Sequence, residues 1–467
     1  MRARITLQIT ADDGTPGAVE EVALLTKATQ GVEDLGLSLA EGKALLAAIQ
    51  RRLVRSQVEA WARGRRRCEG CGRRRRSKGG APIAFRTLFG DVPLASLRLH
   101  RCACEGASGP ATFSPLTELL PDHVAPERLY LEARWASLAP YGAAAAMMGD
   151  VLPIGVGLNA TTLRQHALRA ARRIETEVAQ EDTTLALGCP ADWEDLPIPG
   201  GRVVVGLDGG YVRSWADRTR NFELIVGRSM PEDGGSRYLG FVHGHDREPE
   251  KRIVGVLRAQ GVQANQDVTF LTDGGEEVRS LAFGIAPCGE HVLDWFHIAM
   301  RITVLRQYLR GLAHHEKDVG AELLEDLERL KWLLWHGNGF RAREVLDGLF
   351  MDVDAVEADY PHLRKLKTAA GEMVAYIRRN ARSLINYGER YRAGERISSA
   401  FVEATVNTVV AKRFAKKQQM QWTPRGAHLL LQTRTRTLDG TLRETFERWY
   451  PGLANDNDAE PDHARAA

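Results

Sequence analysis

Two stretches decide the fold expected of this chain: Val203-Val-Val-Gly-Leu-Asp208-Gly-Gly and Val268-Thr-Phe-Leu-Thr-Asp273-Gly-Gly. In each, an apolar run typical of a buried strand ends in an aspartate and two glycines. The glycines leave room for a backbone or a metal-bound phosphate to come close. An Asp-Gly pair is also common in hairpin turns, but its repetition after two strands favours a site built from two carboxylates.

The segments around these stretches have the order strand, strand, strand, helix, strand, helix, strand, helix. The strand-like runs are 202–207, 222–228, 238–244, 267–272 and 291–296, and the helical runs between them are 248–260 and 276–284. This is the order of a ribonuclease H-like domain, in which the ends of the first and fourth strands lie side by side. We therefore expect Asp208 and Asp273 to converge. Carboxylates without cysteine or histidine fit Mg²⁺ (or Mn²⁺), which prefers oxygen ligands.

A third carboxylate is expected from a helix that follows a long helical stretch, residues 298–380. Glu403 is the only acid between Arg396 and Thr437, and Asn407 follows it at i+4 on the same helical face. The alternative for Glu403 is a simple ion pair with a lysine or arginine one turn away.

A separate pattern of cysteines predicts a zinc site. Cys68 and Cys71 form one knuckle, Cys102 and Cys104 form another, and two strand-like runs (84–88 and 92–100) lie between them. Short Cys-x-Cys and Cys-x-x-Cys knuckles present two thiolates at once, so this is the layout of a zinc ribbon holding structural Zn²⁺. Four unrelated thiols are the alternative, and His100 is a possible substitute ligand.

Composition narrows the class of protein. The chain has 467 residues, 44% of them apolar, and six cysteines, which excludes a disordered chain and a disulfide-rich secreted scaffold. No apolar run is long enough for a membrane span or a secretory signal, so we expect no membrane association and a reducing cytoplasm.

The net charge of +3 hides two basic regions. Residues 51–104 carry fifteen Lys and Arg against three acids, and residues 376–436 carry thirteen against three. Such clusters indicate a polyanion partner, because lysine and arginine gain affinity by releasing phosphate counterions. A solvated charged face is the alternative.

Residues 126–148 and 159–178 are expected to form two helices joined by a short link. The second carries Arg164 and Arg169, which in a helix-turn-helix would reach bases or phosphates in a major groove. A plain helical hairpin is equally compatible with this pattern.

The C-terminal part of the chain resembles a known family. The block FVEATVNTVVAKRFAKKQQMQWTPRGAHLLLQTRTRTLDG, residues 401–440, looks like the catalytic signature of bacterial insertion-sequence transposases of the ISKra type, relatives of the Mutator-like elements. Leu293-Asp294-Trp-Phe-His297-Ile resembles the family's Asp-x-x-His element. The similarity covers roughly Arg202 to Gly452.

The resemblance implies a DDE triad of Asp208, Asp273 and Glu403 that binds two Mg²⁺ ions, with all-helical residues inserted before Glu403. Asp294, His297 and Asn407 would orient groups at this site, although a buried Asp294–His297 pair is an equal alternative. Trp422 could stack on a displaced base, with helix packing as the alternative. The residues expected to hold the DNA backbone are Lys412, Arg413, Lys416 and Lys417.

As partners, the resemblance implies double-stranded DNA, namely the element's terminal inverted repeats and the target, and a homodimer or larger synaptic complex. It implies a cytoplasmic protein associated with the bacterial nucleoid. Two alternatives stay open: a structure-selective ribonuclease H-like nuclease, and a non-catalytic DNA-binding protein derived from a transposase.

The expected fold is a multidomain α+β chain: N-terminal zinc-ribbon-like and helical DNA-binding modules, then a ribonuclease H-like α/β catalytic domain with an all-helical insertion. The expected regions are a helical region at 1–62, a zinc-ribbon-like module at 63–115, a helix-turn-helix-like module at 116–189, a linker at 190–201, the catalytic domain at 202–452 with its insertion at about 298–380, and a disordered tail at 453–467.

Overall fold

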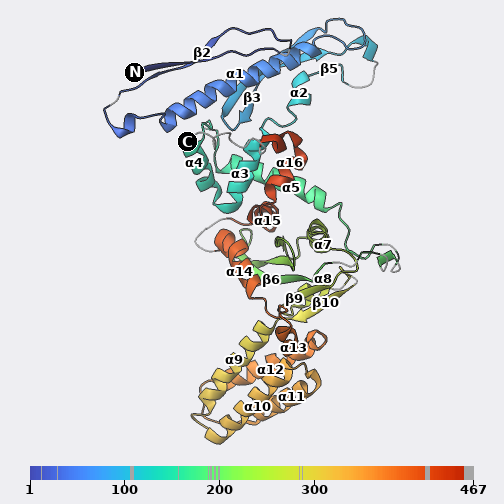
Figure 1. Ribbon diagram of the computed structural model, residues 1–467. Coiled ribbons are helices and arrows are strands. Elements are labelled where there is room, and N and C mark those ends of the chain that lie inside the picture. The colour runs from blue at the N-terminus through green and yellow to red at the C-terminus, as the bar shows by residue number, and fades with distance from the viewer. Residues whose placement is uncertain are drawn as a thin grey trace, which may run out of the picture. The chain divides into compact units, whose positions relative to one another are not determined.

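The computed structural model describes residues 1–11, 13–28, 30–105, 110–155, 157–187, 189, 192–193, 196–197, 200–282, 284–286, 288–415 and 421–456. The chain is a mixed α+β protein of two units, Met1–Ala170 with Thr441–Ala467, and Ala171–Gly440 (Figure 1). Among the described helices, none is long and apolar enough to cross a bilayer. Much of the expected linker and most of the expected tail lie outside the described residues.

The first unit contains two small antiparallel sheets, β1-β2 and β3-β4-β5. Its elements are β1 (Arg2–Leu7), β2 (Glu20–Thr26), η1 (Val32–Asp34), α1 (Leu39–Arg65), β3 (Ser77–Thr87), β4 (Gly90–His100), η2 (Ala103–Glu105), β5 (Thr112–Phe113), α2 (Pro115–Leu119), α3 (Pro126–Leu138), α4 (Tyr141–Val151), α16 (Leu442–Trp449) and η5 (Pro451–Asp456). The division between the units falls within α5 (Ala160–Val178).

Helix α1 begins with a capping box, in which Ser38 and Glu41 satisfy each other's backbone amides. Its buried face, with Val54 and Val58, packs on Val92 and Leu94 of β4. The strands β3 and β4 pair along their length and place one cysteine knuckle before the hairpin and the other after it. Within the expected helical region at 1–62, the helix begins only at Leu39, and β1 and β2 precede it. The expected hairpin is confirmed.

The expected pair of helices at 126–148 and 159–178 is wrong in one respect, because the first of them is two helices. Helix α3 ends at Leu138 and α4 begins at Tyr141. Pro140 lies between them, where its ring and its missing amide hydrogen prevent a continuous helix. Helix α5 starts where expected: the Asn159 side chain accepts the amides of Thr161 and Thr162, both at 3.0 Å.

The second unit is built on one mixed sheet with the strand order β10-β9-β6-β7-β8. Strand β6 pairs antiparallel with β7 and parallel with β9, and β10 is parallel to β9. The elements around this sheet are β6 (Val203–Arg213), β7 (Asn221–Pro231), β8 (Arg237–Val242), α7 (Pro249–Ala259), β9 (Val268–Thr272), α8 (Glu276–Ala282), β10 (Gly289–Leu293), α14 (Ala400–Val406), the π-helix η4 (Asn407–Ala415) and α15 (Pro424–Leu438).

Helices cover both faces of the sheet. The odd-numbered side chains of β6, such as Val205 and Leu207, are buried with Ile253 and Leu257 of α7. On the other face, α14 packs on β6 and β7, and α15 packs on β8. This alternation follows from the two-residue period of a strand.

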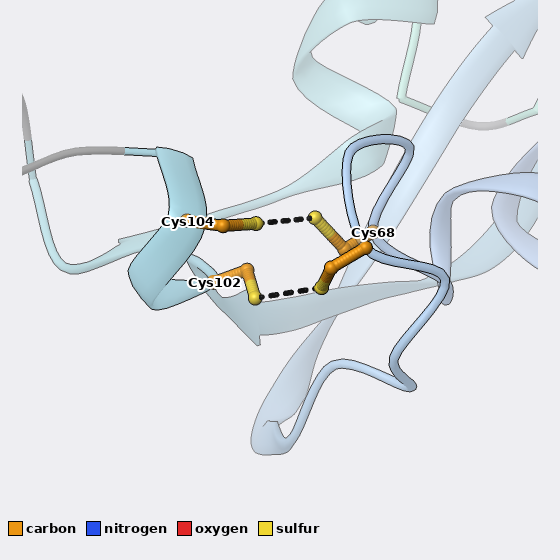
Figure 2. A group of neighbouring side chains, drawn as sticks. Cys68, Cys102 and Cys104 are labelled. Carbon is orange, nitrogen blue, oxygen red and sulfur yellow. Dashed lines mark hydrogen bonds between the residues drawn. The ribbon is translucent and has the colours of Figure 1, made fainter.

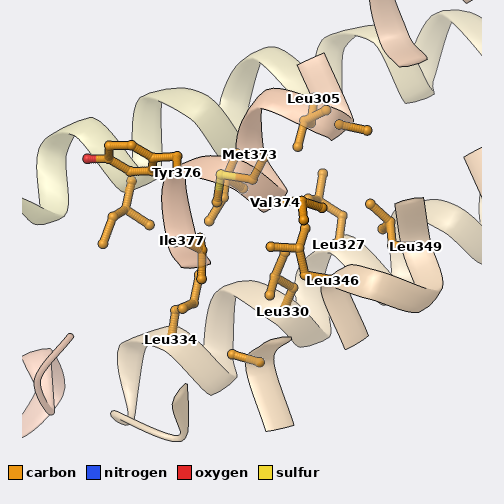
Figure 3. Close-up of a cluster of buried hydrophobic side chains, with 14 of the residues drawn as sticks. Leu305, Leu327, Leu330, Leu334, Leu346, Leu349, Met373, Val374, Tyr376 and Ile377 are labelled. Carbon is orange, nitrogen blue, oxygen red and sulfur yellow. The ribbon is translucent and has the colours of Figure 1, made fainter. Parts of the chain in front are cut away.

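A helical bundle occupies the chain between β10 and α14, as expected for 298–380. Its elements are α9 (Trp295–Leu312), α10 (Lys317–Trp335), α11 (Gly339–Ala355), α12 (Leu363–Arg379), η3 (Ala381–Ser383) and α13 (Tyr387–Arg392). Buried leucines such as Leu305, Leu327 and Leu346 fill its core together with Met373 (Figure 3). The expected strand 291–296 ends early, at Leu293, because Asp294 caps α9.

Candidate functional site

The two aspartates of the repeated pattern follow the last parallel pair between neighbouring strands. Leu207 of β6 pairs with Thr272 of β9, and Asp208 and Asp273 are the next residues. Asp208 is not at a strand tip, as the pattern had suggested, because β6 continues to Arg213 in its pairing with β7. A hairpin turn at Asp208 is thereby excluded.

Charged groups from three other segments act on the pKa of Asp208. Its pKa is raised, first by burial and then by the carboxylates of Asp273 and Glu403. The Gly209 amide, 2.7 Å from Asp208 Oδ1, and the His297 ring act in the opposite direction. Residues from β6, from the end of β9 and from two helices therefore share one electrostatic environment.

Hydrogen bonds hold both the backbone and the side chain of Asp273. The Tyr376 hydroxyl donates to the Asp273 carbonyl at 2.9 Å, and the Gly275 amide donates to Asp273 Oδ1 at 2.9 Å. Gly274 has φ +87°, and a Cβ there would lie 2.6 Å from Leu293 and 2.7 Å from Asn380. This turn requires glycine at position 274, so backbone conformation explains one of the two glycines that follow Asp273.

Glu403 is exposed on α14, and glycine fixes the position of that helix. A Cβ on Gly206 of β6 would lie 2.1 Å from Val402 Cγ2, so α14 packs directly on the backbone of the strand that carries Asp208. The π-helix η4 begins at Asn407, which is exposed. Such π segments often occur at functional sites.

Asp294 is fully buried and connects two helix starts. It caps α9 by accepting the Phe296 amide at 2.8 Å and contacts His297 Nδ1 at 2.7 Å. It also accepts the backbone amide of Ser399 at 3.0 Å and the Ser399 hydroxyl, directly before α14. The Asp294 hydrogen bond is the main cause of the raised pKa of His297. Asp294 thus aligns His297 and the Glu403 helix without facing solvent itself.

Two residues near this site were not found in the sequence. Tyr376 anchors Asp273 from α12, and burial raises its pKa. His291 is buried between Thr272 Oγ1 at 2.8 Å and Ser383 Oγ at 2.6 Å, and burial lowers its pKa to about 4. No local pattern could identify them, because Tyr376 is 103 residues from its partner.

The structure does not offer Trp422 and Arg413 for DNA contact, which corrects two expectations. Trp422 is only 4% exposed and packs on Phe414 with ring centroids 4.7 Å apart. Arg413 is fully buried beside the Trp422 ring. The aromatic side chains exposed in this unit include Tyr211 and Trp215 instead.

The other basic residues expected to contact DNA differ in their surroundings. Lys412 and Arg164 are exposed. Arg169 forms an ion pair with Asp122 at 2.9 Å. Lys416 and Lys417 lie outside the described residues.

The four predicted cysteines meet in the first unit (Figure 2). Cys68 Sγ is 3.3 Å from Cys104 Sγ, Cys71 Sγ is 3.4 Å from Cys102 Sγ, and all four sulfur atoms lie within 4.8 Å of one another. Zn–S bonds of about 2.3 Å in a tetrahedron place sulfur atoms roughly 3.8 Å apart, so the cluster could hold a structural zinc ion. The exposed His100 is not part of it.

The surroundings shift the pKa values of two of the thiols in opposite directions. The Cys104 backbone amide and neighbouring thiols lower the pKa of Cys102 to about 7, whereas hydrogen bonding with Cys68 and the other thiols raises the pKa of Cys104. Glu105 accepts the Cys102 amide at 2.9 Å and pairs with Arg75, which fixes the second knuckle. Such supporting contacts orient metal ligands.

The carboxylate site differs from the cysteine cluster in its spacing. Among the described residues, the four cysteines are the group that could together hold one metal ion, and their ligand atoms all lie within 4.8 Å of one another. Asp208, Asp273 and Glu403 do not form such a group. Ligands that share two ions roughly 3.5–4 Å apart are spread more widely than the ligands of one ion.

Comparisons with known proteins add little to this geometry. No family model and no curated protein matches the chain. Among solved structures, the chain has a distant likeness to the Drosophila P element transposase strand transfer complex, with 12% identity over 69% of this chain and 80% of that chain. The TM-score is 0.22, so this likeness carries no argument here.

Proposed function

We propose that this protein is a DDE transposase of a bacterial insertion sequence, with a ribonuclease H-like catalytic domain. It would bind the ends of the element and catalyse DNA cleavage and strand transfer. The proposal rests on how the strands and α14 pack. Asp208 and Asp273 directly follow the paired residues Leu207 and Thr272, and α14, which bears Glu403, packs on Gly206 of the strand that carries Asp208. The three acids are separated by 65 and 130 residues in the chain. The strand order and the resemblance of residues 401–440 support it.

The donor set fits Mg²⁺ or Mn²⁺. The three acids offer oxygen ligands only, which hard divalent cations prefer. Burial and the negative charges of Asp273 and Glu403 raise the pKa of Asp208, so its ionised form is disfavoured. A bound cation would offset the repulsion among these carboxylates. Asp208, Asp273 and Glu403 would together hold the ions. When bound, such ions lower the pKa of the attacking hydroxyl and stabilise the leaving oxygen.

The protein's own residues would position the reactants. Asp294 holds His297 beside the carboxylates, and its bond to Ser399 sets where Glu403 lies. His297, with its raised pKa, is suited to contact a phosphate of the DNA. No covalent protein–DNA intermediate is required, because water or a 3′-hydroxyl serves as the nucleophile in both steps.

The test is cleavage and strand transfer on labelled duplexes that carry the sequences flanking the gene, with Mg²⁺. Wild type is compared with Asp208→Asn, Asp273→Asn and Glu403→Gln. We expect all three variants to bind DNA but neither to cut nor to join it, with rates reduced by about 10³-fold or more. A matched control is Glu389→Gln, which changes an exposed acid on α13 that is not one of the three proposed ligands.

The outcomes separate the alternatives. Cleavage without joining would favour a ribonuclease H-like nuclease. Full activity of Glu403→Gln beside inactive aspartate variants would show that the third carboxylate is misassigned. DNA binding without cleavage by wild type under any divalent ion would favour a DNA-binding protein derived from a transposase.

A further inference from the structure

The face of α1 in the first unit carries a stripe of arginines. Arg51, Arg55, Arg63 and Arg66 share one side of this helix at offsets of 4, 12 and 15 residues, and all four are exposed. At 1.5 Å per residue, the stripe is about 22 Å long. Glu59 is the one acid within it.

The stripe lines a groove in two adjoining parts. One part, of about 620 Å³, lies between α1 and residues 93–97 of β4, and is lined by Arg55, Arg63 and Arg66. The other, of about 470 Å³, lies between α1 and the β1–β2 hairpin, and is lined by Arg51 and Arg55 together with Arg52 and Glu20. Arg55 and Glu59 line both parts, so the two parts adjoin at these residues.

Pairing distinguishes the stripe from the rest of α1. Arg52, which lines the part of the groove beside the β1–β2 hairpin, is paired with Glu20 at 2.6 Å, and Arg65, which lies off the stripe, is paired with Glu118 at 3.0 Å. Among the described residues, Arg51, Arg55, Arg63 and Arg66 form no ion pair with an acid. The charge of Arg63 contributes to the lowered pKa of Asp13. The acids of this unit neutralise the neighbouring arginines but leave the stripe positive.

We propose that this groove is the main site at which the protein binds the phosphate backbone of duplex DNA, independently of base sequence. Phosphates attract unpaired arginines by counterion release, and a strand of duplex DNA presents one phosphate per 3.4 Å of helix axis, so the stripe spans roughly six of them. No aromatic side chain lines either part, whereas grooves for single strands use aromatic platforms. The partner rests on the proposed function, but the groove differs from the predicted α5 site.

The experiment measures binding of the full-length protein to a labelled duplex of random sequence over a series of salt concentrations, without divalent ions. The test variant is Arg55→Gln with Arg63→Gln and Arg66→Gln. We expect the slope of log K against log salt to fall by about 2–3, and the Kd near physiological salt to rise roughly tenfold or more. The matched control replaces the same three residues with lysine, which keeps the charge, and should bind nearly as wild type does.

Glu59→Lys provides a test of opposite sign, because it completes the stripe. It should tighten binding and increase the salt slope by about 1. Wild-type affinity and slope in the glutamine variant would overturn the inference, as would equal losses in the lysine control or tighter binding of a single strand through the stripe. Cleavage assays keep this inference separate from the proposed function. If the glutamine variant binds DNA weakly but the wild type never cuts DNA, the groove is supported as a DNA-binding site and the transposase proposal is contradicted.

Discussion

The cysteine cluster and the carboxylate site are both sets of potential metal ligands, but the chain builds them differently. The cysteines come from two short turns at the ends of one hairpin, and their sulfur atoms already lie within 4.8 Å of one another. The carboxylates come from two strands and a helix, separated by 65 and 130 residues. A site made by one hairpin depends on local geometry, whereas the carboxylate site depends on how a sheet and a helix pack.

The difference also appears in the supporting contacts. Glu105 and Arg75, which fix the second knuckle, belong to the same module as the cysteines. The carboxylate site instead relies on Asp294, which caps α9, and on Tyr376 of α12, both in the helical bundle. The cysteine site should therefore respond to loss of its metal, and the carboxylate site to disturbed packing.

The largest expected effect is the removal of zinc. A chelator, or Cys68→Ser with Cys71→Ser, should unfold the β3–β4 module, because structural zinc contributes about 10–16 kcal/mol of apparent binding free energy in small zinc domains. Limited proteolysis and metal analysis would show cleavage near residues 68–104 and loss of one zinc ion, with the second unit intact. Cys189→Ser and Cys288→Ser, both outside the cluster, are the controls and should change neither. Persistent protection after chelation would show that the hairpin folds without metal.

The second effect concerns Asp294, which accepts hydrogen bonds from α9 and from Ser399. Asp294→Asn turns an amide donor toward groups that are themselves donors, so we expect a loss of about 2–4 kcal/mol in unfolding free energy and a large loss of cleavage. Denaturant unfolding and single-turnover cleavage measure the two effects.

The control for Asp294 is Ser399→Ala, which removes one hydroxyl and keeps the backbone bond. It should lose about 1 kcal/mol. Equal effects from the two substitutions would contradict the view that Asp294 joins two helix starts.

The third effect comes from the close approach of α14 to β6. Gly206→Ala puts a methyl group 2.1 Å from Val402 Cγ2, so α14 must move and carry Glu403 with it. We expect about 1–3 kcal/mol of destabilisation and roughly 10²-fold slower cleavage with normal DNA affinity. Gly348→Ala on α11, where nothing lies within 4 Å of the new methyl group, should leave cleavage unchanged and should not lower the unfolding free energy, because alanine favours a helix interior over glycine. A fully active Gly206→Ala variant would mean that the position of Glu403 is unimportant.

The smallest effect is the dependence of stability on the charge of Asp208. Because its pKa is raised above 3.8 in the folded protein, the folded state binds more protons than the unfolded state in the window above that value, and stability falls as pH rises through it. At neutral pH the ionised group therefore destabilises the fold. Asp208→Asn should raise the unfolding free energy by about 0.5–1 kcal/mol, the usual size of such gains at active sites.

This gain should be present in metal-free buffer and should reverse when Mg²⁺ is added, because only wild type would then gain stability from the ion. Thermal melts of both proteins with and without Mg²⁺ measure it. Asp217→Asn is the matched control of opposite sign, because hydrogen bonds from Thr219 lower the pKa of this partly exposed aspartate. If Asp208→Asn is less stable than wild type in metal-free buffer, the claim that ionised Asp208 destabilises the fold is wrong.

The local features of this chain could be predicted from its sequence. The capping box of α1, the β3–β4 hairpin and the four cysteines follow from residues a few positions apart. The strands and helices of the second unit were predicted with errors at their ends. The largest is at β6, which the pattern ended at residue 207 and which continues to Arg213. Another is at Asp294, which starts a helix where an apolar pattern suggested strand. The break at Pro140 was missed, although proline is a local signal.

Contacts over long sequence distances could not be predicted in the same way. Trp422 lies in a basic, polar stretch that suggests exposure, yet it is buried against Phe414 and Arg413. His291 and Tyr376 gain their positions from partners about 90–100 residues away, which no periodicity encodes.

The sequence by itself determined the types of ligand in both sites and which strands carry the two aspartates, because residue identity and the two-residue period of a strand are local properties. Only the tertiary structure decided that Asp208 lies inside a strand and that α14 packs on Gly206. It also decided that Arg51, Arg55 and Arg66 line a groove without forming an ion pair among the described residues. Burial and charge neutralisation are sums over neighbours in space, and most of these neighbours are distant in the chain.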